Sequence, residues 1–317
     1  MPEGEVTRDL FLHWLGHTYG RAVSVTSGDA NAWMVADGEL SLVVEVHPLL
    51  AGEDAEWESQ RSLLEDLISD GLPACVALWA PAGARLPTDE PALSEFIDQV
   101  RQSAVRLGPH ERSYAPFPIT LYLRKTAETG GVVSVRGGLN PYWARFTDRV
   151  RGSYDLDSVQ LHRLPEPDEH LEKLIDTVVE ASEGLEVGQV TAIETIDAWT
   201  VQRLEGSEGV TIVGVPPSVT EDAGLAVRRN LRRILAEAGP RLKEADAGAR
   251  ALVLTAYYAR IEQEGATTAM RGCDPVLYRG IDFVCVVTDG LVKPMIHPPA
   301  GAGWDPVAER MGIGGDQ

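Results

Sequence analysis

Residues 29–48 read DANAWMVADGELSLVVEVHP, and residues 197–217 read DAWTVQRLEGSEGVTIVGVPP. Both stretches begin with Asp-Ala, place a tryptophan shortly afterwards, pass through an acidic-glycine turn and end in Val-x-Val-x-Pro. Each is followed by Glu-Asp-Ala, at 53–55 and at 221–223. The offsets 197 − 29 = 168 and 221 − 53 = 168 keep the two stretches in register, so the sequence predicts two divergent copies of one fold.

The first copy shows the periodicity of alternating helices and strands. Apolar spacing predicts helices at 5–19, 53–69 and 91–107, and strands at 22–26, 32–36, 40–47, 74–79 and 119–124. Asp37-Gly38 predicts a tight hairpin between the second and third strands. The strand at 74–79 is a continuous apolar run, which is typical of a buried parallel strand.

The second copy repeats this order. We expect helices at 168–182 and 221–238, the latter stopped by Gly239-Pro240, and strands at 191–204, 210–215, 251–257 and 283–288. The fold class is therefore α/β, with two tandem αβββαβ units and mixed sheets at 1–128 and 166–317. A connecting segment, 129–165, carries a strand at 132–136 and a helix at 140–150. Trp143, Phe146 and Val150 are spaced to face a core, and the alternative is that Trp143 and its neighbouring aromatic and arginine side chains stack on bases.

The composition narrows the classes of partner. Lys and Arg number 28 against 48 Asp and Glu, and the net charge of −20 disfavours binding to nucleic acid. A protein partner remains open. No apolar run approaches the roughly 20 residues of a membrane span, and the first residues lack the pattern of a signal peptide, so we expect a cytoplasmic protein with no membrane partner. Cys75 and Cys285 lie in apolar runs and are expected to be buried.

Two short motifs of the first copy are Gly28-Asp29, at the start of the hairpin, and Glu45-Val46-His47, at the end of a strand. They resemble the Pro-Asp and Glu-x-Lys motifs of the PD-(D/E)XK nuclease-like superfamily. The resemblance implies a restriction-endonuclease-like fold over about residues 3–125. It also implies that Glu5 is the acidic residue of the first helix and Gln60 the polar residue of the following helix.

The chemistry that the resemblance implies needs a divalent metal. Residues i and i+2 of a strand share one face, so Glu45 and His47 project together. Asp29 and Glu45 would bind Mg²⁺ or Mn²⁺ through oxygen, and the ion would activate water for phosphodiester hydrolysis. His47 replaces the lysine of the family and would be a base or a third ligand, because neutral imidazole does not supply a fixed charge. The second copy has Gly214-Val215-Pro216 at this position, so it is degenerate.

Two functional hypotheses stay open. The first is a metal-dependent nuclease or phosphodiesterase with Asp29, Glu45 and His47 as its site; the second is a catalytically inactive scaffold or protein-binding adaptor. Arg228, Arg229, Arg232 and Arg233 share one helix face, and either phosphate, solvent or an acidic surface could meet it. His13 and His17 lie at i and i+4 without the glutamate of a zinc-protease helix.

Overall fold

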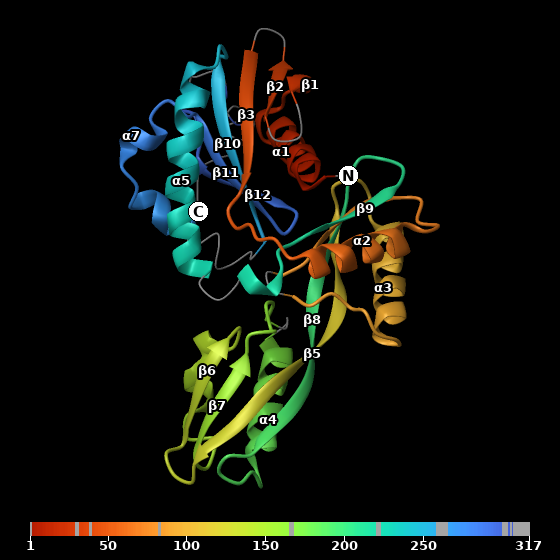
Figure 1. Ribbon diagram of the computed structural model, residues 1–317, viewed down its shortest axis with the longest axis vertical. Helices are drawn as coiled ribbons and strands as arrows, with labels where there is room; N and C mark the ends of the chain where they lie inside the picture. The colour runs from red at the N-terminus through yellow and green to blue at the C-terminus, as the bar shows by residue number, and fades with distance from the viewer. Residues whose placement is uncertain are drawn as a thin grey trace. The chain divides into compact units, whose positions relative to one another are not determined.

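The computed structural model is a mixed α/β protein with two six-stranded sheets (Figure 1). It describes residues 2–28, 32–37, 40–81, 84–164, 168–219, 223–257, 266–299, 304 and 306. The chain divides into two compact units. Unit 1 comprises Met1–Leu86, Val100–Ser113 and Thr200–Gln317, and unit 2 comprises Pro87–Gln99 and Tyr114–Trp199. No helix of the described residues is both long and apolar enough to cross a membrane.

Most elements belong to unit 1. Its helices and strands are α1 (Glu3–Tyr19), β1 (Ser24–Gly28), β2 (Ala32–Asp37), β3 (Leu40–Pro48), α2 (Ala55–Ser69), β4 (Cys75–Trp79), β9 (Gly209–Val213), η2 (Pro217–Val219), α5 (Ala223–Glu244), β10 (Ala249–Ala256), α7 (Pro275–Tyr278), β11 (Phe283–Thr288) and β12 (Leu291–Ile296). The first sheet lies wholly in this unit and has the order β1-β2-β3-β10-β11-β12. β3 is antiparallel to β2 and parallel to β10, and β10 is parallel to β11.

Two helices cover opposite faces of this first sheet. Arg241 of α5 bonds to Glu45 on β3, so α5 lies on the Glu45 face. Thr255 of β10, whose register partner on β3 is Pro48, bonds to Thr7 of α1 at 2.9 Å. Because side chains alternate along a strand, residues 45 and 48 point to opposite faces, and unit 1 is a helix–sheet–helix sandwich.

Unit 2 is smaller and has its own core. It contains β6 (Val132–Gly137), η1 (Asn140–Phe146), β7 (Ser153–Ser158) and α4 (Asp168–Ser182). Three elements pass from one unit to the other: α3 (Ala92–Arg106), β5 (Arg112–Ala127) and β8 (Val190–Arg203). The second sheet has the order β6-β7-β5-β8-β4-β9. Leu121, Phe146 and Ile175 are fully buried in the core of unit 2.

The observed units do not follow the expected division into 1–128 and 166–317, because each unit takes segments from both halves. Val43 lies on β3, in the middle of the first sheet, whereas Val213 lies on β9, at an edge of the second. The matched stretches therefore do not form equivalent strands. The expected order of helix, three strands, helix and strand does occur around the first sheet, beginning with α1, β1, β2 and β3. The second helix and the fourth strand are α5 and β10, however, and not the expected helix at 53–69 and strand at 74–79.

Most predicted elements are present within a few residues, and several details were wrong or missing. α5 continues through Pro240 to Glu244, because the buried stripe of Leu231, Leu235 and Ala238 extends to Leu242 and offsets one lost backbone bond. Residues 140–146 form a 3₁₀ helix, and its tighter turn leaves Trp143 53% exposed. β5 begins at Arg112, seven residues before the predicted strand, and β7, β12, η2 and α7 were not predicted.

The structure confirms two simpler expectations. Cys75 and Cys285 are buried free thiols, as is Cys273. Arg228, Arg229, Arg232 and Arg233 are all exposed, on the side of α5 away from the buried Leu231, Ile234 and Leu235. As expected, the four guanidinium groups share one exposed face of an amphipathic helix.

Candidate functional site

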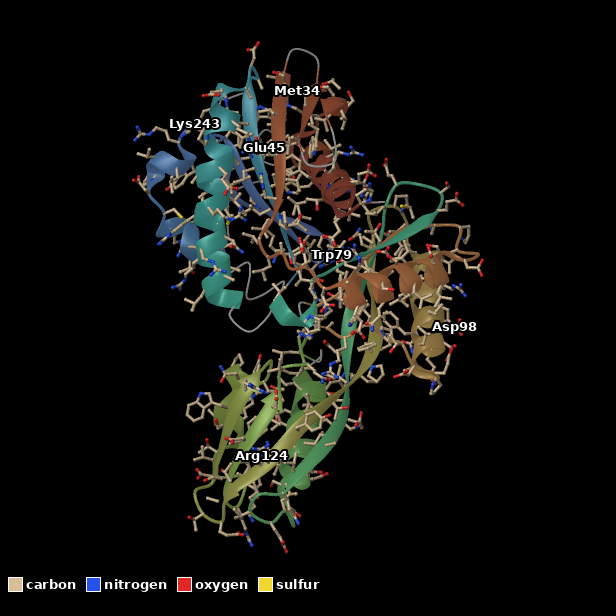
Figure 2. The ribbon with its side chains drawn as sticks, viewed as in Figure 1. Met34, Glu45, Trp79, Asp98, Arg124 and Lys243 are labelled. Carbon is tan, nitrogen blue, oxygen red and sulfur yellow. The ribbon has the colours of Figure 1, made fainter. Side chains whose placement is uncertain are left out.

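The predicted Glu45–His47 pair forms on the face of β3 that α5 covers (Figure 2). His47 Nε2 lies 3.1 Å from Glu45 Oε2, as the i, i+2 spacing predicted. Glu45 also accepts two bonds from Arg241, from Nε to Oε1 at 3.2 Å and from Nη2 to Oε2 at 2.6 Å. Burial raises the pKa of the Glu45 carboxyl, but the bonds from Arg241 and His47 outweigh it and hold this pKa below its ordinary value. A guanidinium therefore already compensates this carboxylate.

Glu5 and Gln60, the two helix residues of the predicted site, do not join this pair. Asp29 lies outside the described residues. Glu5 is half-buried on α1, and Gln60 donates to Glu56 one turn earlier on α2, at 3.2 Å. The predicted helix positions thus occur on helices, but neither contacts Glu45 or His47 through a hydrogen bond or ion pair that the described structure contains.

Glu194 and Asp197 are acidic residues of the second predicted copy, and both have structural partners in unit 2. Glu194 accepts from the Thr120 hydroxyl at 3.1 Å. Asp197 is buried and accepts from the backbone N–H of Arg163 at 3.0 Å, and it lies 2.9 Å from Nδ1 of His162. Asp197 fixes the loop that contains these two residues.

A second polar site, which we call the carboxylate pocket, lies in unit 1. Its volume is about 490 Å³. Charged and phenolic side chains line it, namely Glu3 of α1, Glu58, Arg61 and Glu65 of α2, and Tyr257 after β10. Pro48, Ala51 and Pro216 add an apolar part to its wall. Three carboxylates surround one guanidinium.

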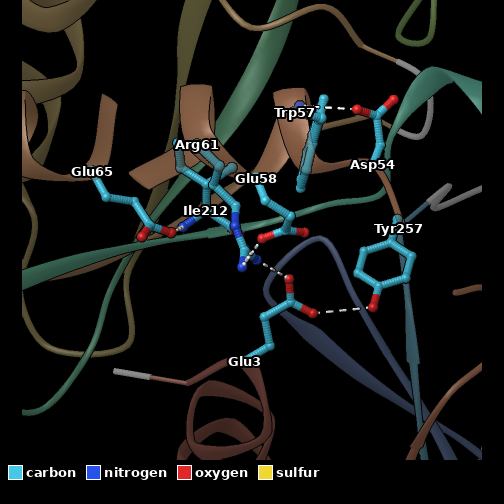
Figure 3. Close-up of polar contacts among 8 residues, drawn as sticks. All are labelled: Glu3, Asp54, Trp57, Glu58, Arg61, Glu65, Ile212 and Tyr257. Carbon is cyan, nitrogen blue, oxygen red and sulfur yellow. Dashed lines mark hydrogen bonds and ion pairs between the residues drawn. The ribbon is translucent and has the colours of Figure 1, made fainter. Parts of the chain in front are cut away.

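Arg61 is the centre of the contacts in this pocket (Figure 3). Its Nη1 lies 2.8 Å from Glu3 Oε1, and its Nη2 lies 2.5 Å from Glu58 Oε2. The other oxygen of Glu3 accepts from the Tyr257 hydroxyl at 3.1 Å. Glu65 accepts from the backbone N–H of Ile212 at 2.7 Å, which satisfies a donor on the edge strand β9.

The single arginine does not compensate the carboxylates. Burial raises the pKa of Glu3 to about 7, although Arg61, the Tyr257 hydroxyl and the Gly214 N–H all favour the charged form. Burial also raises the pKa of Glu65, against the bond from Ile212. The pocket therefore favours a proton or another positive charge near neutral pH.

Sequence reasoning missed the residues of this pocket. It selected Glu5 and Gln60, whereas Glu3 and Arg61, on the same two helices, converge. The pair Glu58 and Arg61 at i, i+3 was the available local signal. Their meeting with Glu3 depends on packing between segments 58 positions apart, which no local pattern encodes.

Comparison of the chain with protein-family models, curated proteins and solved structures found no match in any of the three.

Proposed function

We propose that this chain is a non-catalytic binding protein whose carboxylate pocket takes a primary amine on an aliphatic stem, as in a lysine side chain of a protein partner or in a small polyamine. The observation that carries the proposal is the excess of carboxylates around Arg61, with the pKa of Glu3 raised to about 7. The apolar wall of Pro48, Ala51 and Pro216 suits the stem, and the carboxylates suit the ammonium group.

Because Glu3 is partly protonated near pH 7, binding of an amine should be coupled to the release of a proton from Glu3. An ammonium group favours ionised Glu3, so binding near pH 7 should release a fraction of a proton, at most about one half when the pH equals the pKa. Below pH 7, the dissociation constant should rise by about tenfold for each pH unit, because a proton competes for the same carboxylate. Compensation of Glu45 by Arg241 supports the binding function over catalysis at that carboxylate.

The test is calorimetric titration of the full chain at pH 7 with N-acetyl-lysine methylamide, with spermidine and with a lysine-rich peptide, in two buffers of different ionisation enthalpy. We expect buffer-dependent heats, and weakening of about tenfold in Glu58→Gln, which removes a charge and keeps the shape. Glu56→Gln, on the same helix and outside the pocket, is the matched control. Binding only by the peptide would assign a protein partner, and binding by spermidine alone a polyamine.

Absence of binding by all three probes, or equal affinity in Glu58→Gln and Glu56→Gln, would overturn the proposal.

The second candidate is the metal-dependent phosphodiesterase. The contact between Glu45 and His47 on one strand face favours it. In that case Mn²⁺ or Mg²⁺ should raise the melting temperature, with about 2.7 kcal/mol of added stability at 100-fold saturation. Glu45→Gln should abolish the rise and Glu194→Gln should not. No metal-dependent shift and no cleavage of DNA or RNA in Mn²⁺ would remove this candidate.

A further inference from the structure

Three side chains of the type that binds metals meet elsewhere in unit 1. Asp9 lies on α1, His110 in the turn between α3 and β5, and Glu205 in the turn between β8 and β9. One ligand atom of each lies within 4.8 Å of the others. Within the described part of the chain, no other three His, Cys, Asp or Glu side chains meet this condition.

The backbone holds two of these residues in place. His110 has a left-handed conformation, with φ of 62°, which is unfavourable for a residue other than glycine. Its N–H donates to the carbonyl of Arg203 at 2.8 Å, and the Arg203 N–H donates back to the carbonyl of Glu111 at 3.0 Å. The His110 turn is therefore tied to the strand end that leads to Glu205.

Two polar atoms of the cluster are buried without a hydrogen bond. The His110 side chain is 8% exposed, and its Nδ1 lies 3.6 Å from Oδ2 of Asp9. Neither atom has a hydrogen-bond partner among the residues that the structure describes. A buried polar atom that is left unpaired is unfavourable, and a ligand between these two atoms would satisfy both of them.

The separation fits an ion better than a shared proton. In the His162–Asp197 pair of unit 2, Nδ1 and the carboxylate oxygen close to 2.9 Å. Two ligands of a tetrahedral Zn²⁺ ion, each about 2.1 Å from the metal, lie roughly 3.4 Å apart. The His110–Asp9 separation of 3.6 Å is close to that value. Glu205 Oε1 lies 3.5 Å from His110 Nε2 on a side chain that is 74% exposed, so Glu205 can rotate toward the same ion.

His13 packs against the site without belonging to it. Its ring stacks on that of His110 at 3.7 Å between centroids and 13° between planes. Imidazole nitrogens bind metals in the plane of the ring, so nearly parallel rings do not direct their nitrogens to one point. His13 therefore holds the His110 ring in position.

We propose that Asp9, His110 and Glu205 bind one divalent transition-metal ion, Zn²⁺ in the first place, through His110 Nδ1 and one oxygen of each carboxylate. A nitrogen ligand with two carboxylates suits Zn²⁺ better than Mg²⁺, which prefers an all-oxygen shell. Three protein ligands leave a fourth position for water or another ligand. The site is separate from the carboxylate pocket and shares none of its residues.

The test uses the full chain, freed of metal with a chelator and titrated with ZnCl₂ by calorimetry and by melting temperature. CoCl₂ then reports the ligand set through its visible absorption. We expect one ion per chain and a higher melting temperature. Glu205→Gln should weaken binding at least tenfold, and Glu208→Gln, an exposed residue of the same turn, should not. His110→Asn should abolish binding, because it removes imidazole and asparagine tolerates positive φ.

Three results would overturn the proposal. The first is no Zn²⁺ binding by the wild-type chain. The second is equal binding by the Glu205→Gln and Glu208→Gln variants. The third is binding that survives His110→Asn and is lost in His17→Gln, which would assign the ion to the i, i+4 pair of His13 and His17. Circular dichroism of His110→Asn shows whether the variant folds, and the exposed Glu205→Gln keeps the test decisive if it does not.

Discussion

Glu45 and Glu3 are two shielded carboxylates of unit 1 that each meet an arginine, yet their charge states differ. At Glu45, one guanidinium and one imidazole serve one carboxylate, and its pKa is lowered. At Glu3, one guanidinium is shared with Glu58, and burial raises the pKa to about 7. The balance between burial and the bonds from cationic partners therefore decides whether such a carboxylate keeps its charge near neutral pH or takes up a proton.

Removing the arginine at the compensated carboxylate should have the largest effect. Arg241→Met leaves Glu45 buried with only His47, and we expect a loss of about 2–3 kcal/mol at pH 7, below the value for fully buried pairs because Arg241 is 56% exposed. The pKa of Glu45 is lower in the folded than in the unfolded protein. The pair therefore stabilises the fold when the pH lies above the pKa of the unfolded protein, and this stabilisation is lost as the pH falls through the pKa of the folded protein. Urea unfolding at pH 7 and at pH 4 measures the loss in the variant and its dependence on pH.

The control for this variant lies on the same helix. Arg233→Met breaks the exposed i, i+4 pair with Glu237 and should cost less than about 0.5 kcal/mol. Equal losses in the two variants would show that Arg241 does not compensate a buried charge.

An effect of opposite sign is expected at the uncompensated carboxylate. Glu3→Gln removes the charge, keeps one oxygen that can accept from Arg61, and places an NH₂ group that can donate to the Tyr257 hydroxyl oxygen. Because the pKa of Glu3 is raised to about 7 in the folded protein, wild-type stability should fall as the pH rises from 4.5, the ordinary pKa of a glutamate, through 7. The variant should match wild type near pH 4 and exceed it by about 1–2 kcal/mol at pH 9, after allowance for the exposed quarter of the side chain. A stability difference that does not change with pH would contradict the raised pKa.

The smallest effect tests the hydrogen bond to Glu3. Tyr257→Phe removes the hydroxyl that donates to ionised Glu3 at 3.1 Å, so the pKa of Glu3 should rise further, by less than about one unit. Carbon-13 titration of labelled glutamate side chains measures it. The apparent pH midpoint of amine binding should move in the same direction, and a downward shift in either measurement would be inconsistent with this role.

Local patterns predicted the elements and not their partners. β3 and α2 were expected at 40–47 and 53–69 and lie at Leu40–Pro48 and Ala55–Ser69. The strand at Cys75–Trp79 was rightly seen as buried and parallel to a neighbour, but it pairs with β9 in the second sheet. A continuous apolar run shows that a strand is covered on both faces; it carries no information about which strand lies beside it.

For the Glu45–His47 site, too, the sequence predicted the local arrangement and not the partner from a distant segment. Strand alternation placed Glu45 and His47 on one face, and the structure confirms it. Arg241 lies 196 positions further along the chain than Glu45. Its guanidinium group neutralises the Glu45 carboxylate, which would otherwise be open to a metal ion. Such a contact follows from the pairing of β3 with β10 and from the packing of α5, neither of which local sequence determines.

The pairing of β3 with β10 also affects how the protein folds during its synthesis. Leu42 pairs with Ala249, and 249 − 42 = 207 residues separate them. At about 5–20 residues per second, a ribosome needs roughly 10–40 s to supply the second strand after the first. During this time β3, with its alternating apolar face, has one unpaired edge, which can pair with another nascent chain. We therefore expect aggregation during expression to depend on elongation rate and on chaperones that bind the first fifty residues.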